Sequence, residues 1–153
     1  AGGEPTALNW GKRNLSTSSP LADGRFDVIF HPVSNCYVED VFPIWRECFR
    51  VLKPGGVLLA GFDNGLNFLF EDDPLTVVNR LPFNPLKMPE EAFRRMAENG
   101  EGIQFSHTME EQLGGQLKAG FRLVDLYEDR DREGGAAIRE YAPQYMATRA
   151  MKP

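Results

Sequence analysis

Two short apolar runs enclose an amphipathic segment in the first half of the chain. Residues 26–31 and 57–62 are almost continuously apolar, as in strands covered on both faces. Between them, residues 41–52 carry one stripe at helical spacing, formed by Val41, Trp45, Cys48 and Leu52. Asp40 is suited to cap this segment, and the Lys53-Pro54-Gly55-Gly56 run ends it. The pattern predicts a strand–helix–strand unit.

The second half of the chain predicts two helices followed by two strands. One helix spans about 89–99, and a second runs from Thr108 to Gly120 behind a capping-box pattern, with Glu111 three residues after Thr108. Strands are expected at 121–127 and 141–151. An acidic, mobile loop at 128–140 joins them in place of a crossover helix, so we expect the two strands to pair antiparallel.

The stretch from Asp63 to Pro89 reads as long and irregular. It is too apolar for a free linker, and irregular segments of this length in compact domains are usually lids or binding loops. Its aromatic residues Phe68, Phe70 and Phe83 form either a wall against a substrate or a small satellite core, and the sequence alone does not separate the two.

The composition of the chain indicates which classes of partner it can bind and in which compartment it works. The 153 residues suffice for one core, and the net charge of −5 with scattered Lys and Arg disfavours a nucleic-acid surface. There is neither a basic-then-apolar leader nor an apolar run near the roughly 20 residues of a membrane span. The two cysteines, Cys36 and Cys48, fit a reducing compartment. We therefore expect a cytoplasmic protein with no nucleic-acid or membrane partner.

Several of these segments together resemble a known enzyme family. The fourth strand, next helix and fifth strand of class I S-adenosylmethionine-dependent methyltransferases of type 11 resemble two stretches of this sequence, Phe26–Phe30 and 41–59. The most specific part of the second stretch is its Leu52-Lys53-Pro54-Gly55-Gly56 run. Residues 120–124 and 145–150 are similar to the final hairpin of that family. The resemblance implies an α/β fold: part of a Rossmann-like, three-layer α/β/α methyltransferase sheet, with a carboxyl-terminal antiparallel hairpin.

The resemblance also implies a division of the chain and an activity. Residues 25–153 correspond to the carboxyl-terminal half of a methyltransferase domain, with 63–89 as a lid-like insertion. Residues 1–24 form an amino-terminal segment, partly disordered, with a short strand at 6–10. The implied cofactor is S-adenosylmethionine, and the implied reaction is methyl transfer to a small-molecule acceptor.

The elements with which the family binds its cofactor are not found before Phe26. The family uses a strand that ends in a glycine-rich turn and an acidic residue that binds the ribose. Where it often places an Asp facing the adenine, the best match is Lys12, which cannot accept a hydrogen bond. We expect this chain alone to be inactive. The alternative function is a non-catalytic, truncated module that acts in self-association or partner binding.

The resemblance also predicts a homodimer. In the strand order of the family, residues 26–30 form an interior strand, and its outer neighbour belongs to the half that is not found in this sequence. An exposed, uncharged sheet edge recruits another strand, and a two-fold dimer that buries Val28 and Ile29 near the contact would close it. Alternatively, residues 6–10 fold back and cover the edge of the 26–30 strand themselves.

Candidate site residues follow the carboxyl ends of the two predicted strands, where α/β sheets bind ligands. The resemblance places His31, Pro32 and Val33 along the cofactor, and Ser34 and Asn35 along the substrate; a polar strand end that caps the next helix is an equal alternative.

Other candidates are more ambiguous. Asp63 and Asn64 face a substrate or form an Asx turn, and His107 covers the substrate or belongs to a helix cap. Cys36 has no cation near it in sequence that would activate it, and Cys48 lies on the core stripe. Gly114-Gly115 inside a helix requires close packing or close approach of a ligand, and we favour packing. We assign neither a catalytic residue nor a metal ligand.

Overall fold

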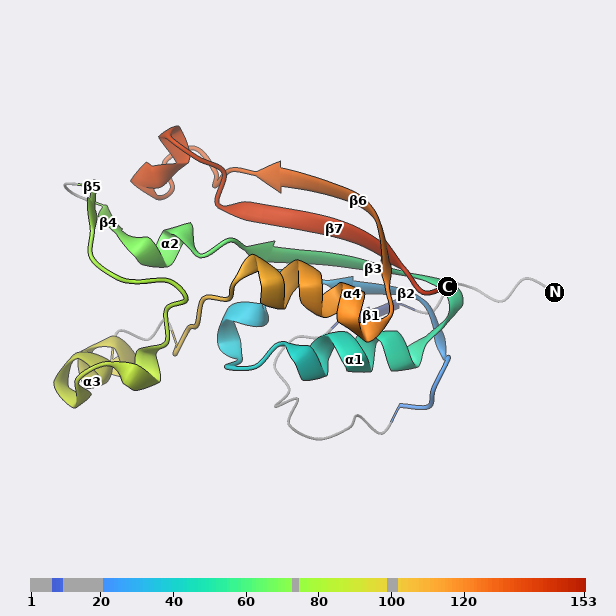
Figure 1. Cartoon of the computed structure of the whole chain (residues 1–153). Coiled ribbons are helices and arrows are strands. Elements are labelled where there is room, and N and C mark those ends of the chain that lie inside the picture. Colours follow the sequence, from blue (N-terminus) through green and yellow to red (C-terminus); the bar gives the residue numbers. More distant parts are fainter. Residues whose placement is uncertain (1–6, 10–20, 73–74, 99–101) are drawn as a thin grey trace.

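The computed structural model describes residues 7–9, 21–72, 75–98 and 102–153, which form a five-stranded sheet of order β1-β2-β3-β7-β6 (Figure 1). β1 (Ala7–Asn9), β2 (Phe26–His31) and β3 (Leu52–Asp63) are parallel. β7 (Tyr145–Met151) runs antiparallel to both β3 and β6 (Arg122–Asp129). The α/β class and the antiparallel carboxyl-terminal hairpin are thus confirmed.

One face of the sheet carries the core. α1 (Phe42–Val51) and α4 (Gly115–Ala119), preceded by a π-helical turn at Glu110–Gly114, lie together on this face (Figure 1). Fully buried side chains from the strands and from α1 meet there: Ile29, Leu58, Ala150, Trp45, Cys48 and Val51. The packing role predicted for Cys48 is confirmed.

The opposite face of the sheet exposes apolar side chains. Phe30 is 53% exposed and Tyr127 is 62% exposed, and Leu59 and Leu126 beside them are also exposed. These four residues line a groove of about 450 Å³, which we call the outer groove. Asp125 and Arg149, register partners on β6 and β7, line it as well.

The strand–helix–strand unit forms close to its predicted bounds. β2 matches the prediction, and α1 begins at Phe42, whose backbone N–H donates to the Asp40 carboxylate at 2.9 Å. Pro43 lies in the first turn, where it costs no helical hydrogen bond. The predicted stop at 53–56 lies inside β3, at a shift in its register with β2.

The segment after β3 is more regular than predicted. It contains α2 (Leu66–Leu69), the antiparallel pair β4 (Phe70–Asp72) and β5 (Leu75–Val77), and a 3₁₀ turn at Pro85–Lys87. α3 (Glu90–Glu98) follows, as predicted. All of these elements lie beyond the carboxyl end of β3 (Figure 1). The prediction of an irregular 63–89 segment is wrong for 66–72 and 75–77, because elements of three or four residues leave too short a pattern to be detected.

The last strand begins at Tyr145, four residues later than predicted. Ala137–Glu140 form a 3₁₀ turn, and Pro143 has no N–H to donate to a strand ladder. The preceding 3₁₀ turn therefore replaces the first part of the expected strand.

The amino-terminal edge is covered by the chain itself. β1 pairs with β2 in the register Ala7–Val28, Leu8–Ile29 and Asn9–Phe30, which is the fold-back alternative left open by the sequence. Ile29 is fully buried in the core of its own chain, so its predicted burial by a second copy is wrong. Of the predicted segment 1–24, residues 1–6 and 10–20, including Lys12, lie outside the described residues.

Candidate functional site

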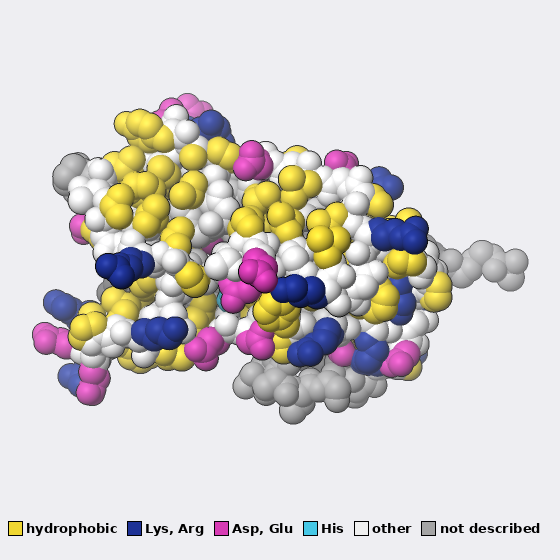
Figure 2. Space-filling model, in the orientation of Figure 1, with side chains coloured by type: hydrophobic (Ala, Val, Ile, Leu, Met, Phe, Trp, Pro, Cys, Tyr) yellow, Lys and Arg dark blue, Asp and Glu magenta, His cyan; other side chains and the backbone are white. Residues whose placement is uncertain are grey.

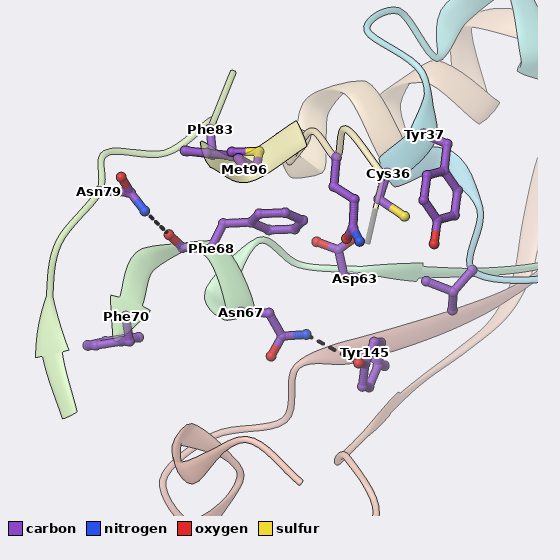
Figure 3. Close-up of a pocket in the computed structure, with 13 residues that line it drawn as sticks. Cys36, Tyr37, Asp63, Asn67, Phe68, Phe70, Asn79, Phe83, Met96 and Tyr145 are labelled. Atoms are coloured by element: carbon purple, nitrogen blue, oxygen red, sulfur yellow. Dashed lines mark hydrogen bonds between the residues drawn. The ribbon is translucent and has the colours of Figure 1, made fainter. Parts of the chain in front are cut away.

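A cavity of about 460 Å³ opens at the carboxyl ends of β2 and β3, and we call it the end pocket (Figure 3). It is bounded by the turn after β2, by the end of β3, by the segment from α2 to α3, and by the start of β7. Its lining residues are Val33, Cys36, Tyr37, Asp63, Asn67, Phe68, Phe70, Asn79, Phe83, Met96, Gly102, Gln104 and Tyr145.

Asp63 supplies the only charged side chain among the described residues that line the end pocket. It is 3% exposed, and its Oδ1 accepts a hydrogen bond from Gly65 N at 2.9 Å. Burial raises the pKa of this carboxyl above its usual value, and the hydrogen bond from Gly65 offsets only part of that effect. The predicted Asx turn is confirmed, and the same side chain also borders the cavity.

Aromatic rings face Asp63 across the cavity. Phe68 and Phe83 stack with their ring centroids 5.5 Å apart, and Asn79 Nδ2 donates to the Phe68 carbonyl at 2.8 Å (Figure 3). Phe83 is 8% exposed. The two interpretations of these phenylalanines therefore combine, because Phe83 is buried as in a satellite core while both rings form a pocket wall.

Two other lining residues carry weakly polar groups. Tyr145 Oη accepts a hydrogen bond from Asn67 Nδ2 at 3.3 Å. Burial raises the pKa of Cys36 to about 11, so its thiol stays protonated near neutral pH. The structure thus supports the inference that Cys36 is not an activated nucleophile.

A buried polar network lies next to the end pocket. His31 Nε2 donates to Asn35 Oδ1 at 2.7 Å, and Asn35 Nδ2 donates to Gln112 Oε1 at 2.6 Å. The network continues through Gln116, whose Nε2 donates to Gln112 O at 3.2 Å and whose Oε1 accepts from Thr148 Oγ1 at 3.0 Å. These five side chains are almost completely buried, and they join β2, the helical layer and β7.

This network decides what His31 can do. Burial lowers the pKa of His31 below its usual value, so the ring is neutral near pH 7. The ring also packs edge-on against Trp45, with centroids 5.6 Å apart. The His31 side chain is almost completely buried, and His31 lines neither the end pocket nor the outer groove.

The other predicted site residues are held by hydrogen bonds within the protein. Ser34 Oγ donates to Pro32 O at 3.0 Å, and His107 Nε2 donates to Asn35 O at 3.0 Å. Asn64 Oδ1 accepts from Leu66 N, and its Nδ2 donates to Pro143 O. The neighbouring Thr108–Glu111 capping box is confirmed, with hydrogen bonds in both directions.

Of the eight predicted site residues, only Val33 and Asp63 line the end pocket, and their ligand contacts stay predictions. Sequence reasoning missed Tyr37, Met96, Gln104 and Tyr145, which come from segments far apart in the chain. No local pattern marks them, because only the tertiary fold brings them together.

Comparisons with known proteins agree with this architecture. Residues 4–60 match a family described as "Methyltransferase domain". The "Uncharacterized methyltransferase YbaJ" of Bacillus subtilis is 39% identical over 147 residues, which cover 92% of this chain and 56% of that protein. This chain is a relative of the class I methyltransferases.

Further relatives show the same relationship. A "probable S-adenosylmethionine-dependent methyltransferase" of Mycolicibacterium smegmatis is 30% identical over 128 residues, covering 84% of this chain and 44% of that protein. The crystal structure of an S-adenosylmethionine-dependent methyltransferase from Mesorhizobium loti superposes with a TM-score of 0.63 at 16% identity, covering 92% of this chain and 67% of that one. The chain spans about half the length of these two curated relatives.

The cofactor that this methyltransferase family implies is S-adenosylmethionine, and the described residues fit one wall of its site. Val33 lines both the end pocket and the outer groove, and Pro32 lines the outer groove. Neither the glycine-rich turn nor the ribose-binding acid of the family is found among the described residues that precede β2, which are 7–9 and 21–25. The described residues therefore do not make a complete cofactor site.

No group of three or more His, Cys, Asp or Glu side chains among the described residues could hold a metal ion. In the same part of the chain, no helix combines the length and the apolar character needed to cross a membrane.

Proposed function

We propose that the complete protein is an S-adenosylmethionine-dependent methyltransferase that methylates a small molecule held in the end pocket. The observation that carries this proposal is the position of that pocket, at the carboxyl ends of parallel strands of a methyltransferase sheet. Ligands of open α/β sheets bind at this edge. Its volume of about 460 Å³ suits a small molecule.

The predicted site residues take different parts in this proposal. Asp63 contacts the substrate, and Pro32 and Val33 border the cofactor. Ser34, Asn35, Asn64 and His107 hold the walls through the hydrogen bonds described above, and His31 supports them from the core.

A small molecule fits the surface better than a nucleic acid does. On the face that carries α1 and α4, side chains of Lys and Arg alternate with those of Asp and Glu (Figure 2). A nucleic-acid surface would need clustered positive charge. Cys36 and Cys48 are free and buried, which supports the proposed cytoplasmic location.

Labelled methyl transfer tests the proposal. The complete protein, incubated with S-adenosylmethionine labelled in its methyl group, should label compounds in a small-molecule extract. Label that enters only protein or nucleic acid would contradict the small-molecule acceptor. For the 153-residue chain alone we expect no measurable heat on titration with S-adenosylmethionine, with the Mycolicibacterium smegmatis relative, named a probable S-adenosylmethionine-dependent methyltransferase, as the comparison. Micromolar binding would show that the chain completes the cofactor site.

The outer groove supports a second candidate function, a non-catalytic module that self-associates as a homodimer. Exposed apolar side chains gathered on one sheet face mark interaction surfaces. Asp125 and Arg149 give the same groove both signs of charge, which a two-fold contact between identical surfaces can pair. This contact uses the outer face of the sheet, because β1 covers part of the β2 edge.

A further inference from the structure

We propose that the end pocket recognises an organic amine in its cationic form, carried on an aromatic or otherwise apolar body. The inference rests on the proposed function, because it names the class of molecule that the acceptor pocket would take. Three features of the pocket lining support it: one buried carboxylate, a surround of aromatic rings, and uncharged polar groups elsewhere.

Charge is the first argument. Asp63 is the only charged group among the described lining residues, and neither Lys nor Arg is among them. A carboxylate or phosphate ligand would enter a buried site whose described lining already holds a carboxylate and includes no Lys or Arg to pair with it. His107 lies outside this lining; it acts electrostatically on Asp63, and its Nε2 already donates to Asn35 O. An ammonium group would instead compensate the charge of Asp63, which lies at the end of β3 with a fixed orientation set by Gly65.

The aromatic lining is the second argument. Five aromatic side chains border the cavity: Tyr37, Phe68, Phe70, Phe83 and Tyr145. Figure 3 shows Phe68 on one side of Asp63 and Cys36 and Tyr37 on the other. Aromatic rings attract a cation to their faces within about 6 Å and also pack against an apolar body. Rings around an acid are thus suited to both ends of an arylalkylamine.

The remaining lining groups are neutral. Cys36 is a protonated thiol near neutral pH, Met96 is apolar, and Asn67, Asn79 and Gln104 carry uncharged amides. The Nδ2 atoms of Asn67 and Asn79 already donate to Tyr145 and to Phe68. None of these groups carries a positive charge that would pair with an anion. Selectivity for a cation therefore depends on Asp63 and the rings.

The test compares three probes that share one phenyl body. Titration calorimetry at pH 7 with phenethylamine, 2-phenylethanol and 3-phenylpropionate should show the amine binding at least about tenfold more tightly than the alcohol. Binding of the acid should not be detectable. Equal affinities, tighter binding of the acid, or no binding of the amine would overturn the proposal.

Variants locate the effect within the pocket. Asp63→Asn keeps the Oδ1 that accepts from Gly65, and it should abolish the preference for the amine over the alcohol. Asp27→Asn, at the opposite end of β2, should leave that preference unchanged. Should Asp63→Asn fail to fold in a thermal melt, Phe68→Leu is the second variant, and it should weaken amine binding several-fold. An unchanged amine preference in a folded variant would contradict the assignment.

The outcome is separable from that of the proposed function. Probe binding requires no cofactor, so an amine preference without methyl transfer would contradict the methyltransferase proposal alone. Methyl transfer to an acceptor that is not an amine, with no amine preference, would contradict this inference alone.

Discussion

Trp45 organises the contact between the helices and the sheet. Its Nε1 donates to Glu111 O at 3.0 Å, one edge of its ring meets His31, and its Cδ1 lies against Gly115. A Cβ built on Gly115 would lie 2.4 Å from Trp45 Cδ1, closer than real contacts allow. The glycine at this position is therefore explained by close packing, which confirms the prediction made for Gly114-Gly115 at Gly115.

The neighbouring glycines give a matched pair of variants. We expect Gly115→Ala to lower the free energy of unfolding by about 1–3 kcal/mol, because the added methyl group must displace Trp45. Gly114→Ala should raise it by up to about 1 kcal/mol, because the new Cβ meets only Glu110 Cγ at 3.5 Å and alanine favours the helix. Urea denaturation measures both. Equal effects would show that Trp45 does not limit this position.

His31 should make stability depend on pH. Burial holds its pKa in the folded chain below the usual 6.5, so the unfolded chain takes up the proton first as the pH falls. The contribution of His31 to stability is therefore fully present above pH 6.5 and decreases below it, by at most about 1.4 kcal/mol per pH unit. His31→Gln should remove this component. Denaturation of both proteins from pH 7.5 to 5 checks it, and a wild-type stability that gains on the variant in acid would contradict it.

At the scale of single elements, the capping box begins the helical segment that carries Gln112. Thr108 Oγ1 accepts from Glu111 N at 3.1 Å, and Glu111 Oε2 accepts from Thr108 N at 2.8 Å. We expect Thr108→Ala to cost about 1 kcal/mol of stability. Glu111→Ala should cost less in the Thr108→Ala background than alone, because the two side chains share their contacts. Additive losses in this double-mutant cycle would show independent roles.

Elements whose pattern is local could be predicted from the sequence. β2, α1 and the final hairpin each carry their own periodicity and end signals. The sequence could not decide whether β1 pairs with β2, because three residues carry too little pattern to specify a strand partner about 20 residues away. The π-helical turn at Glu110–Gly114 could not be distinguished from an ordinary helical turn, because both show the same periodicity over five residues. The candidate site shows the same limit, as Asp63 was predicted but Tyr145 was not.

At the scale of the whole molecule, the sheet has one buried and one exposed face. If the outer groove is a contact between two copies, sedimentation should show a dimer that dissociates on dilution. Leu126→Lys should shift the chain towards monomer, because it places a charge in the apolar groove. Leu117→Lys is the control, an exposed leucine on α4 and thus on the other side of the sheet. A monomer at every concentration would exclude the dimer.

The buried network of His31, Asn35, Gln112, Gln116 and Thr148 has a consequence for how this chain can change over generations. A single substitution within it leaves a partner unpaired, at a cost of about 1–3 kcal/mol. Replacing two hydrogen-bonded partners together avoids this loss of stability. These positions should therefore covary among related sequences. None of the five lines the end pocket. Residues of the pocket wall can therefore be substituted, and the acceptor can change, while the five residues of the buried network stay the same or change together.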